Sequence, residues 1–159
     1  MRLAVFQPDI AANLGAMIRT AACFGCPVDV IEPCGFPFSI KALRRAAMDY
    51  ADIADVTRHD DWSAFRAAQA PDSRLVVLST KGAVDVWDHA FRHTDVYLMG
   101  RESAGLPDHV HAAADAVIRI PMPGGGRSLN VSVSAGIILA EALRHARDRY
   151  PSRPCRGRE

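Results

Sequence analysis

Short apolar runs alternate along this chain with longer segments in which apolar residues recur at helical spacing. The apolar runs are rich in Val, Ile and Leu, which predicts strands over residues 3–6, 28–31, 74–79, 95–99 and 116–121. The longer segments predict helices over residues 13–24, from Asp60 or Asp61 to 68, 107–114 and 130–149. Strands that alternate with helices are typical of a parallel sheet with helices on both faces. We therefore predict an α/β fold.

The helix boundaries depend on residues with defined capping roles. We expect Asn13 to cap the first helix and Gly25 to end it. Pro107 suits the first position of a helix, and Asn130 begins the last one.

Length and composition indicate one domain. The chain has 159 residues, 49% of them apolar and 23% charged, values that are close to the average for globular proteins. We expect residues 1–150 to form this domain, and residues 151–159, which lack an apolar pattern, to form a basic, disordered tail. The net charge is +1, but from Arg144 onward six arginines accompany only two acidic residues. Such a segment suits contact with phosphates.

The cysteines and histidines predict neither a metal site nor a disulfide framework. Cys23 and Cys26 form a C-x-x-C pair, which we interpret as small buried groups at the end of a helix and not as a redox motif. His109 and His111 share a predicted helix without a third ligand, so we predict no metal. Unpaired thiols, a first apolar run too short for a signal peptide and no apolar segment of about 18 residues predict a cytoplasmic protein without membrane association.

Three loops that follow predicted strands combine small residues with polar side chains. The first, residues 8–20, reads P-D-I-A-A-N-L-G-A-M-I-R-T. The second, residues 98–107, reads L-M-G-R-E-S-A-G-L-P, with two glycines around a glutamate. In the third, residues 120–134, I-P-M and a glycine-rich stretch lead into S-L-N-V-S-V-S. Small residues beside a helix N-terminus suit an anionic or nucleotide ligand, so we expect a ligand site where these loops meet at the carboxyl end of the sheet.

Together, P-x-I-x-x-N-x-G-x-x-x-R, G-R-E-S-A-G-L-P and I-P-M followed by S-L-N-V-S-V-S resemble the three signature motifs of the SPOUT superfamily of S-adenosylmethionine-dependent RNA methyltransferases. The resemblance is to the ribose 2′-O-methyltransferase branch and covers almost the whole chain. I-E-P-x-G-F around Pro33, R-R-A-x-x-D-Y over residues 44–50 and the expected lack of an added RNA-binding domain are similar to the members that methylate the wobble ribose of tRNA, at a cytidine or uridine in position 34.

The resemblance implies features that periodicity does not. The C-terminal third is expected to form a deep trefoil knot, and the knotted loops to bind S-adenosylmethionine, with S-adenosylhomocysteine as the product and no metal. Members of this branch are homodimers in which the first motif of one subunit completes the site of the other. The positions that the resemblance assigns to the cofactor are Leu78, Thr80, Gly100, Glu102, Ile120, Met122, Ser128 and Leu129.

The resemblance also implies catalytic roles for Arg19, Asn13, Glu102, Ser128 and Asn130. Arg19 would accept the proton of the ribose 2′-hydroxyl with help from a substrate phosphate, or would hold that phosphate while another group takes the proton. Asn13 would orient the loop or the ribose, and Glu102 would position Arg19 or the cofactor. Ser128 and Asn130 would bind cofactor and phosphate.

The expected partner is tRNA, with no role for DNA or a membrane. The residues expected to contact the RNA are Arg19, Lys41, Arg44, Arg45 and Arg127.

Three alternatives remain open. The same chemistry could act on another tRNA or ribosomal RNA nucleotide, because the motifs do not specify the target. A knotted RNA-binding protein without catalysis is disfavoured because the catalytic positions are all present. A nucleotide-dependent oxidoreductase is disfavoured because the G-x-G-x-x-G fingerprint is missing.

Overall fold

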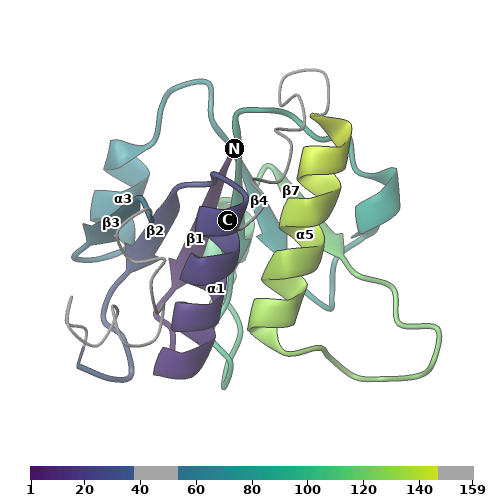
Figure 1. The fold of residues 1–159 in the computed structure, drawn as a ribbon, viewed down its shortest axis with the longest axis horizontal. Coiled ribbons are helices and arrows are strands. Elements are labelled where there is room, and N and C mark those ends of the chain that lie inside the picture. Colours follow the sequence, from purple (N-terminus) through teal and green to yellow (C-terminus); the bar gives the residue numbers. More distant parts are fainter. Residues whose placement is uncertain (38–53, 147–159) are drawn as a thin grey trace, which may run out of the picture.

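The computed structural model describes residues 1–37 and 54–146, which are built around one sheet of seven strands (Figure 1). Neighbouring strands all run parallel, in the order β3-β2-β1-β6-β4-β7-β5. The predicted α/β fold with a parallel sheet is therefore confirmed. The strands are β1 (Arg2–Phe6), β2 (Val28–Ile31), β3 (Val56–His59), β4 (Arg74–Leu78), β5 (Val84–Asp85), β6 (Asp95–Met99) and β7 (Ala116–Arg119).

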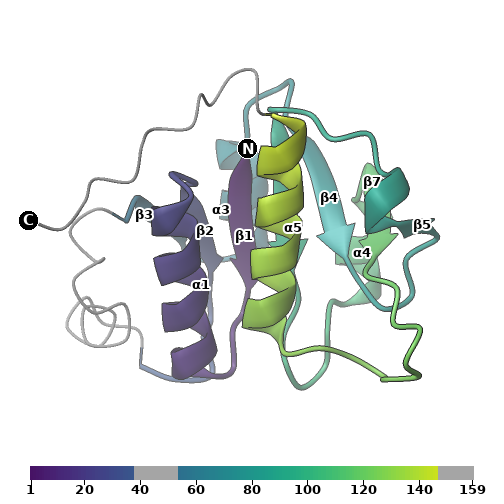
Figure 2. The same cartoon turned by 45° about the vertical axis from the view of Figure 1, so that its right-hand side comes forward.

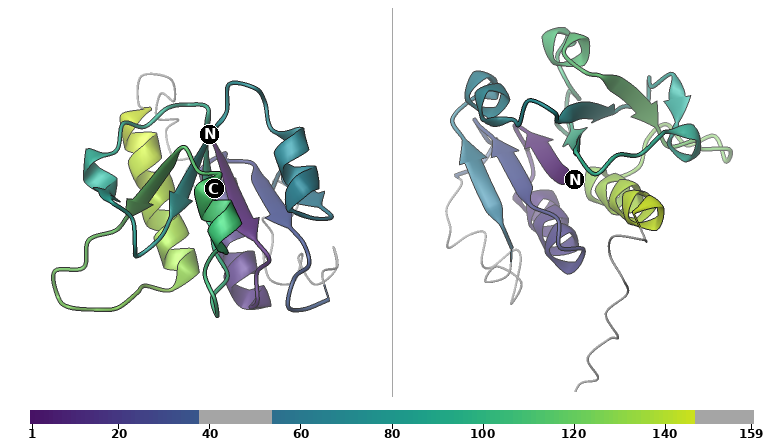
Figure 3. Two further views of the ribbon diagram at one scale, coloured as in Figure 1. Left: turned by 180° about the vertical axis from the view of Figure 1, so that it is seen from behind. Right: turned by 90° about the horizontal axis from the view of Figure 1, so that it is seen from above.

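Helices cover both faces of the sheet, as Figures 2 and 3 show. On one face, α1 (Ala11–Cys23) and α5 (Val131–His145) lie side by side. On the other face lie α3 (Trp62–Ala68) and α4 (Asp108–Ala112). The short 3-10 turn η2 (Val86–Asp88) follows β5. Among the described residues, no helix has the length and apolar character needed to cross a membrane.

The central strands send their side chains into two apolar layers. In β1, Leu3 and Val5 pack in the layer beneath α1 and α5, whereas Ala4 and Phe6 pack in the layer beneath α3 and α4. Because both faces of β1 are buried, this strand appears in the sequence as a continuous apolar run.

The sequence located β2 and β6 at their observed bounds but missed two strands. β3 pairs only with β2 and lies at one edge of the sheet, and its Thr57 and Arg58 are exposed, so it shows no apolar run. β5, at the opposite edge, has only two residues, of which Val84 is exposed. Edge strands of this kind carry little of the hydrophobic signal that periodicity detects.

The expected helix caps are partly correct. Asn130 caps α5, with its side-chain oxygen accepting a hydrogen bond from the Ser132 N–H. Gly25 follows the end of α1 in the left-handed conformation, with φ of 64°. The prediction for Asn13 is wrong: Ile10 is the N-cap, and Asn13 lies in the first turn of α1. Its side chain is bound to Glu102 instead, as described below.

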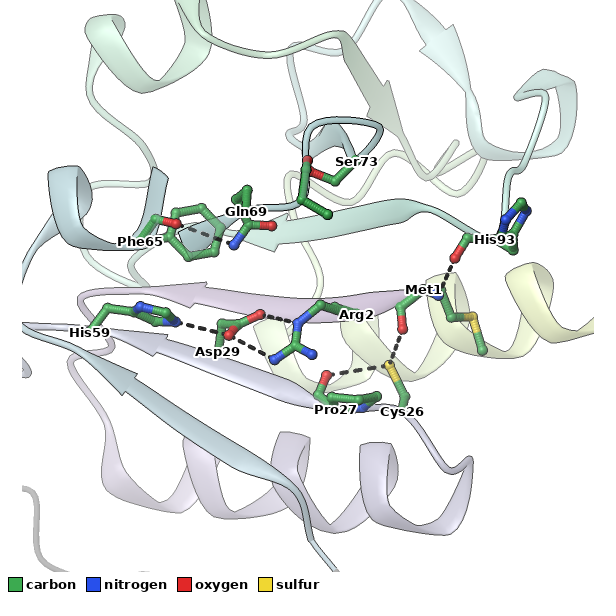
Figure 4. A network of polar contacts seen from close by, with 11 residues as sticks. Met1, Arg2, Cys26, Pro27, Asp29, His59, Phe65, Gln69, Ser73 and His93 are labelled. Atoms are coloured by element: carbon green, nitrogen blue, oxygen red, sulfur yellow. Dashed lines mark hydrogen bonds and ion pairs between the residues drawn. The ribbon is translucent and has the colours of Figure 1, made fainter. Parts of the chain in front are cut away.

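Two buried carboxylates join strands near their amino ends. Asp29 of β2 accepts hydrogen bonds from Arg2 Nε at 2.7 Å and Nη2 at 2.9 Å, and His59 Nε2 lies 2.9 Å from its Oδ1 (Figure 4). Asp95 of β6 is fully buried and accepts from Arg74 Nε and Nη2 at 2.8 and 2.9 Å. Burial favours a higher pKa for Asp95, but the hydrogen bonds from Arg74 and from the Arg92 N–H outweigh it and hold the pKa below the ordinary 3.8.

The buried pair of Arg74 and Asp95 predicts a large stability loss for Arg74→Met. Removing the guanidinium leaves a buried, uncompensated carboxylate, so the free energy of unfolding should fall by about 3–5 kcal/mol. Urea denaturation followed by circular dichroism measures this at neutral pH. The deficit should shrink below the ordinary pKa of 3.8, because a protonated Asp95 needs no cation.

Arg119→Met is the matched control. Arg119 forms an exposed pair with Asp85, at 2.6 Å and with 49% of the arginine side chain exposed. Its removal should cost less than about 1 kcal/mol. Equal losses in the two variants at neutral pH would contradict the role given to the buried pair.

Candidate active site

A cavity of about 520 Å³ opens at the carboxyl ends of β6, β4 and β7, which are neighbours in the sheet. The loops that leave these strands line it, together with residues from the starts of α1 and α5. This is the edge at which parallel α/β sheets bind ligands, at the carboxyl ends of their strands. The volume lies within the range of small-molecule sites.

The cavity brings together most of the positions that the motifs singled out. All eight positions assigned to the cofactor line it: Leu78, Thr80, Gly100, Glu102, Ile120, Met122, Ser128 and Leu129.

Asn13 and Asn130 also line the cavity. Arg19 and Arg127 are exposed and are not among its lining residues. The other positions expected to contact RNA, as well as the basic C-terminal segment, lie outside the described residues: Lys41, Arg44, Arg45 and residues 147–159.

The carboxylate of Glu102 joins the loop after β6 to the loop after β1. Its Oε1 accepts a hydrogen bond from Asn13 Nδ2 at 2.9 Å, and its Oε2 accepts one from the Asp9 backbone N–H at 2.9 Å. Each such bond to an ionised group contributes about 1.5–3 kcal/mol. Glu102 was expected to position Arg19 or the cofactor; the structure shows it holding Asn13 and the backbone of Asp9.

Glu102 also sets the orientation of two amide side chains. A carboxylate only accepts hydrogen bonds, so Asn13 must turn its NH2 group toward Glu102 and its Oδ1 away. That oxygen accepts from Asn130 Nδ2 at 3.1 Å. The Oδ1 of Asn130 then accepts from the Ser132 N–H at 2.8 Å and from the Ser132 hydroxyl at 2.6 Å. A directed chain of hydrogen bonds therefore runs from Glu102 to the N-terminus of α5.

A second contact joins the same two loops in the opposite sense. The Asp9 carboxylate accepts hydrogen bonds from the Ser103 hydroxyl at 2.5 Å and from the Ser103 N–H at 3.1 Å. These bonds lower the pKa of Asp9 below its ordinary 3.8. Because the Asp9 N–H donates to Glu102, each loop both donates to and accepts from the other.

The loop that carries Glu102 turns back on itself at two glycines. The Arg101 N–H donates to the Gly105 carbonyl at 3.0 Å, and the Gly105 N–H donates to the Arg101 carbonyl at 2.9 Å. Gly105 has φ of 67°, which favours glycine. A Cβ atom on Gly100 would lie 2.8 Å from the carbonyl carbon of Gly105. The tight loop therefore requires the glycines that the sequence shows on either side of Glu102.

The chemical character of the cavity suits a nucleoside with a charged end. Leu78, Ile120 and Met122 provide apolar surface, while Ser128 and Asn130 bring polar side chains to the start of α5. A flat aromatic base with polar edges matches such a mixture. S-adenosylmethionine therefore fits the residues that are present.

Sequence reasoning missed several lining residues because each lies next to a motif without belonging to its pattern. Their only signal in the sequence is a position at a strand end or in the first turn of a helix. These residues are Ile10, Met99, Leu106, His111, Val131 and Ser134. It also missed Arg101, which lies between two of the predicted positions.

The thiols and the acidic and imidazole groups offer no competing site. Within residues 1–37 and 54–146, no three His, Cys, Asp or Glu side chains are placed to hold a metal ion. Cys26 is buried, and burial raises the pKa of its thiol to about 11, which disfavours the reactive thiolate. The interpretation of Cys26 as a core residue is confirmed, whereas Cys23 is exposed, so its predicted burial is wrong.

Comparison with known proteins gives the same answer from sequence and from structure. Residues 1–140 match the SpoU rRNA Methylase family. A tRNA (cytidine(34)-2'-O)-methyltransferase from Beijerinckia indica is 52% identical over 143 residues, which cover 89% of each chain.

Two solved structures share the fold. One, described as giving structural insights into the 2-OH methylation of C/U34 on tRNA, has a TM-score of 0.88 and 39% identity, and the match covers 93% of this chain and 97% of that one. The other, an AdoMet-bound rRNA methyltransferase from Sinorhizobium meliloti, has a TM-score of 0.80 and 32% identity, over 91% of this chain and 56% of that one.

The family match spans all three motif loops, and the structure brings those loops together around one cavity. The chain belongs to the SpoU rRNA Methylase family.

Proposed function

We propose that this protein transfers a methyl group from S-adenosylmethionine to the 2′-hydroxyl of the wobble ribose, nucleotide 34, of tRNA. The observation that carries the proposal is the convergence of all eight assigned cofactor positions on one cavity, beside the chain of hydrogen bonds from Glu102 to Asn130. Support for nucleotide 34 comes from the Beijerinckia relative and from the solved structure concerned with C/U34, both of which match over most of their own length.

S-adenosylmethionine supplies an electrophilic methyl group on its sulfonium sulfur. The apolar side chains of Leu78, Ile120 and Met122 would pack against its adenosine part. Gly100 and Gly105 let backbone groups approach the ligand closely. The AdoMet-bound neighbour of 32% identity supports this choice of cofactor.

The ribose 2′-hydroxyl must lose its proton as its oxygen attacks the methyl carbon, so a nearby group must accept that proton. A guanidinium with a pKa above about 12 is a weak base. Arg19 therefore either accepts the proton with help from a substrate phosphate or holds the phosphate that accepts it. Asn13 and Asn130, whose amide orientations are fixed, would orient the ribose and its phosphate.

The position of Arg19 supports a site shared between two subunits. In its own chain Arg19 is exposed and outside the lining of the cavity. Large apolar side chains are exposed at the starts of both helices on that face: Ile10 by 47%, Leu129 by 41% and Val133 by 51%. A homodimer formed through the face of α1 and α5 would cover these side chains and bring Arg19 to the partner's cavity (Figure 2).

Two further features complete the proposal. The C-terminal third forms a trefoil knot; its support is that β7 inserts between β4 and β5, both earlier in the chain, and that α5 then crosses to the opposite face of the sheet. Residues 1–150 form the catalytic domain. Outside the cavity, phosphate contacts come from Lys41, Arg44, Arg45, Arg127 and the basic tail.

The proposal predicts methylation at a single ribose. The protein is incubated with methyl-labelled S-adenosylmethionine and total tRNA from a strain that lacks its gene, and the product is mapped by mass spectrometry. We expect 2′-O-methylation at nucleotide 34 and no label in a reaction without protein. Label confined to ribosomal RNA or to another tRNA position contradicts the assignment of the substrate while leaving the family unchanged.

Arg19→Ala should separate cofactor binding from turnover. The cavity does not include Arg19, so the affinity for S-adenosylhomocysteine, measured by calorimetry, should stay within about threefold of wild type. Turnover should fall by about 100-fold or more, the scale of a general base or a charge-positioning group. Equal losses of affinity and turnover would show that Arg19 maintains the structure instead.

The shared site makes the Arg19→Ala variant rescuable by a second defective subunit. A heterodimer with Glu102→Gln combines an intact cavity from the first subunit with an intact Arg19 from the second. Purified through two different tags, it should recover about half of wild-type turnover, because one of two symmetric sites is rebuilt. A heterodimer as inactive as both parents would place Arg19 and its cavity in the same chain.

A further inference from the structure

Arg101 is the one Lys or Arg among the described residues that line the cavity. The proposed reaction brings two kinds of anion there, the carboxylate of the cofactor's amino-acid part and the phosphates of the RNA. On the basis of that proposed function, we propose that the Arg101 guanidinium binds this oxyanion and so positions the ligand. Neither the motifs nor the similar proteins assign it this role.

The side chain of Arg101 is held only loosely by the protein. One Nη atom donates to Gln7 Oε1 at 3.3 Å and the other to Asp9 Oδ1 at 3.4 Å, both longer than the usual range for N–H···O bonds. Its Nε is buried and has no hydrogen-bond partner. Buried donors are nearly always paired in proteins, so this nitrogen marks a position where a ligand oxygen is expected.

Two other arginines show what a structural arginine looks like in this fold. Arg2 and Arg74 each make two hydrogen bonds to a buried aspartate, at distances of 2.7 to 2.9 Å. Arg101 has no such bidentate partner, and 37% of its side chain is exposed. Its planar set of donors is therefore available to a carboxylate or a phosphate, which it can bind in a bidentate manner.

The surroundings allow Arg101 to turn toward a ligand without disrupting the site. The Asp9 carboxylate already accepts the two shorter hydrogen bonds from Ser103, so it does not depend on the arginine. The backbone of Arg101 is fixed by its two hydrogen bonds with Gly105. Only the side chain has to move, from a fixed point on the cavity wall.

Arg101→Gln tests the proposal with two ligands that differ in the carboxylate. Calorimetry measures the affinity for S-adenosylhomocysteine, which carries the carboxylate, and for 5′-methylthioadenosine, which lacks it. If the cofactor supplies the oxyanion, the first affinity should fall by about 10-fold or more and the second should stay unchanged. If the RNA supplies it, both affinities stay unchanged. In that case the KM for tRNA should rise by about 10-fold or more, and the log–log salt slope of tRNA binding should fall by about 0.7 to 0.9, as for one lost phosphate contact.

Two outcomes would overturn the proposal. One is wild-type behaviour of Arg101→Gln with both ligands and with tRNA. The other is an equal loss of affinity for both ligands, which would mean that Arg101 only shapes the cavity. Arg101→Lys should recover part of the lost affinity, because it keeps the charge but not the bidentate geometry.

Arg66→Gln is the control for the change in charge, since Arg66 is exposed on α3, which packs on the opposite face of the sheet from α1 and α5. It should match wild type in every measurement. A wild-type protein that neither binds S-adenosylhomocysteine nor methylates tRNA would refute the proposed function, whereas an active wild type with an unaffected Arg101→Gln variant refutes only the role of Arg101.

Discussion

An ionised carboxylate can only accept hydrogen bonds, and the site depends on this property of Glu102. It draws the NH2 group of Asn13 and the N–H of Asp9 toward the loop after β6. The helix N-terminus of α5, which offers only donors, imposes the same direction from the other end through Asn130. Each amide between these two ends has one orientation available. Residues far apart in the sequence are thereby held as one arrangement before any ligand binds.

The parallel sheet supplies the rigid support for this arrangement. Buried pairs of arginine and aspartate fix the amino ends of β1 and β4 against their neighbours, while the carboxyl ends are left to loops of glycine and small polar residues. Stability and function are thus placed at opposite ends of the same strands. Such a division lets the loops meet the needs of a ligand without weakening the core, and it is general in α/β folds of this kind.

The sequence predicted the parts of the molecule that local patterns encode. Central strands such as β6 are recognisable because both faces are buried, and the cofactor positions because they lie in motifs at strand ends. Asn13 was assigned to a helix cap because local sequence favours that role; its actual partner, Glu102, is 89 positions away in the chain. The pairing of Asp9 with Ser103 and the unpaired Nε of Arg101 also arise from long-range contacts that periodicity does not contain. Arg19 illustrates a further limit, since its proposed partner surface belongs to a second chain.

Binding of S-adenosylhomocysteine to Glu102→Gln, measured by calorimetry, tests the central role of this carboxylate most directly. Whichever way a glutamine turns its amide, its NH2 group meets a donor, either Asn13 Nδ2 or the Asp9 N–H, so one hydrogen bond is lost and a donor is left unpaired. We predict an affinity about 10-fold or more below wild type, with an unchanged circular dichroism spectrum, because the loss of a charged hydrogen bond falls on the loops and not on the core. An affinity equal to that of wild type would contradict the account, because the cavity would then form without the carboxylate that joins its loops.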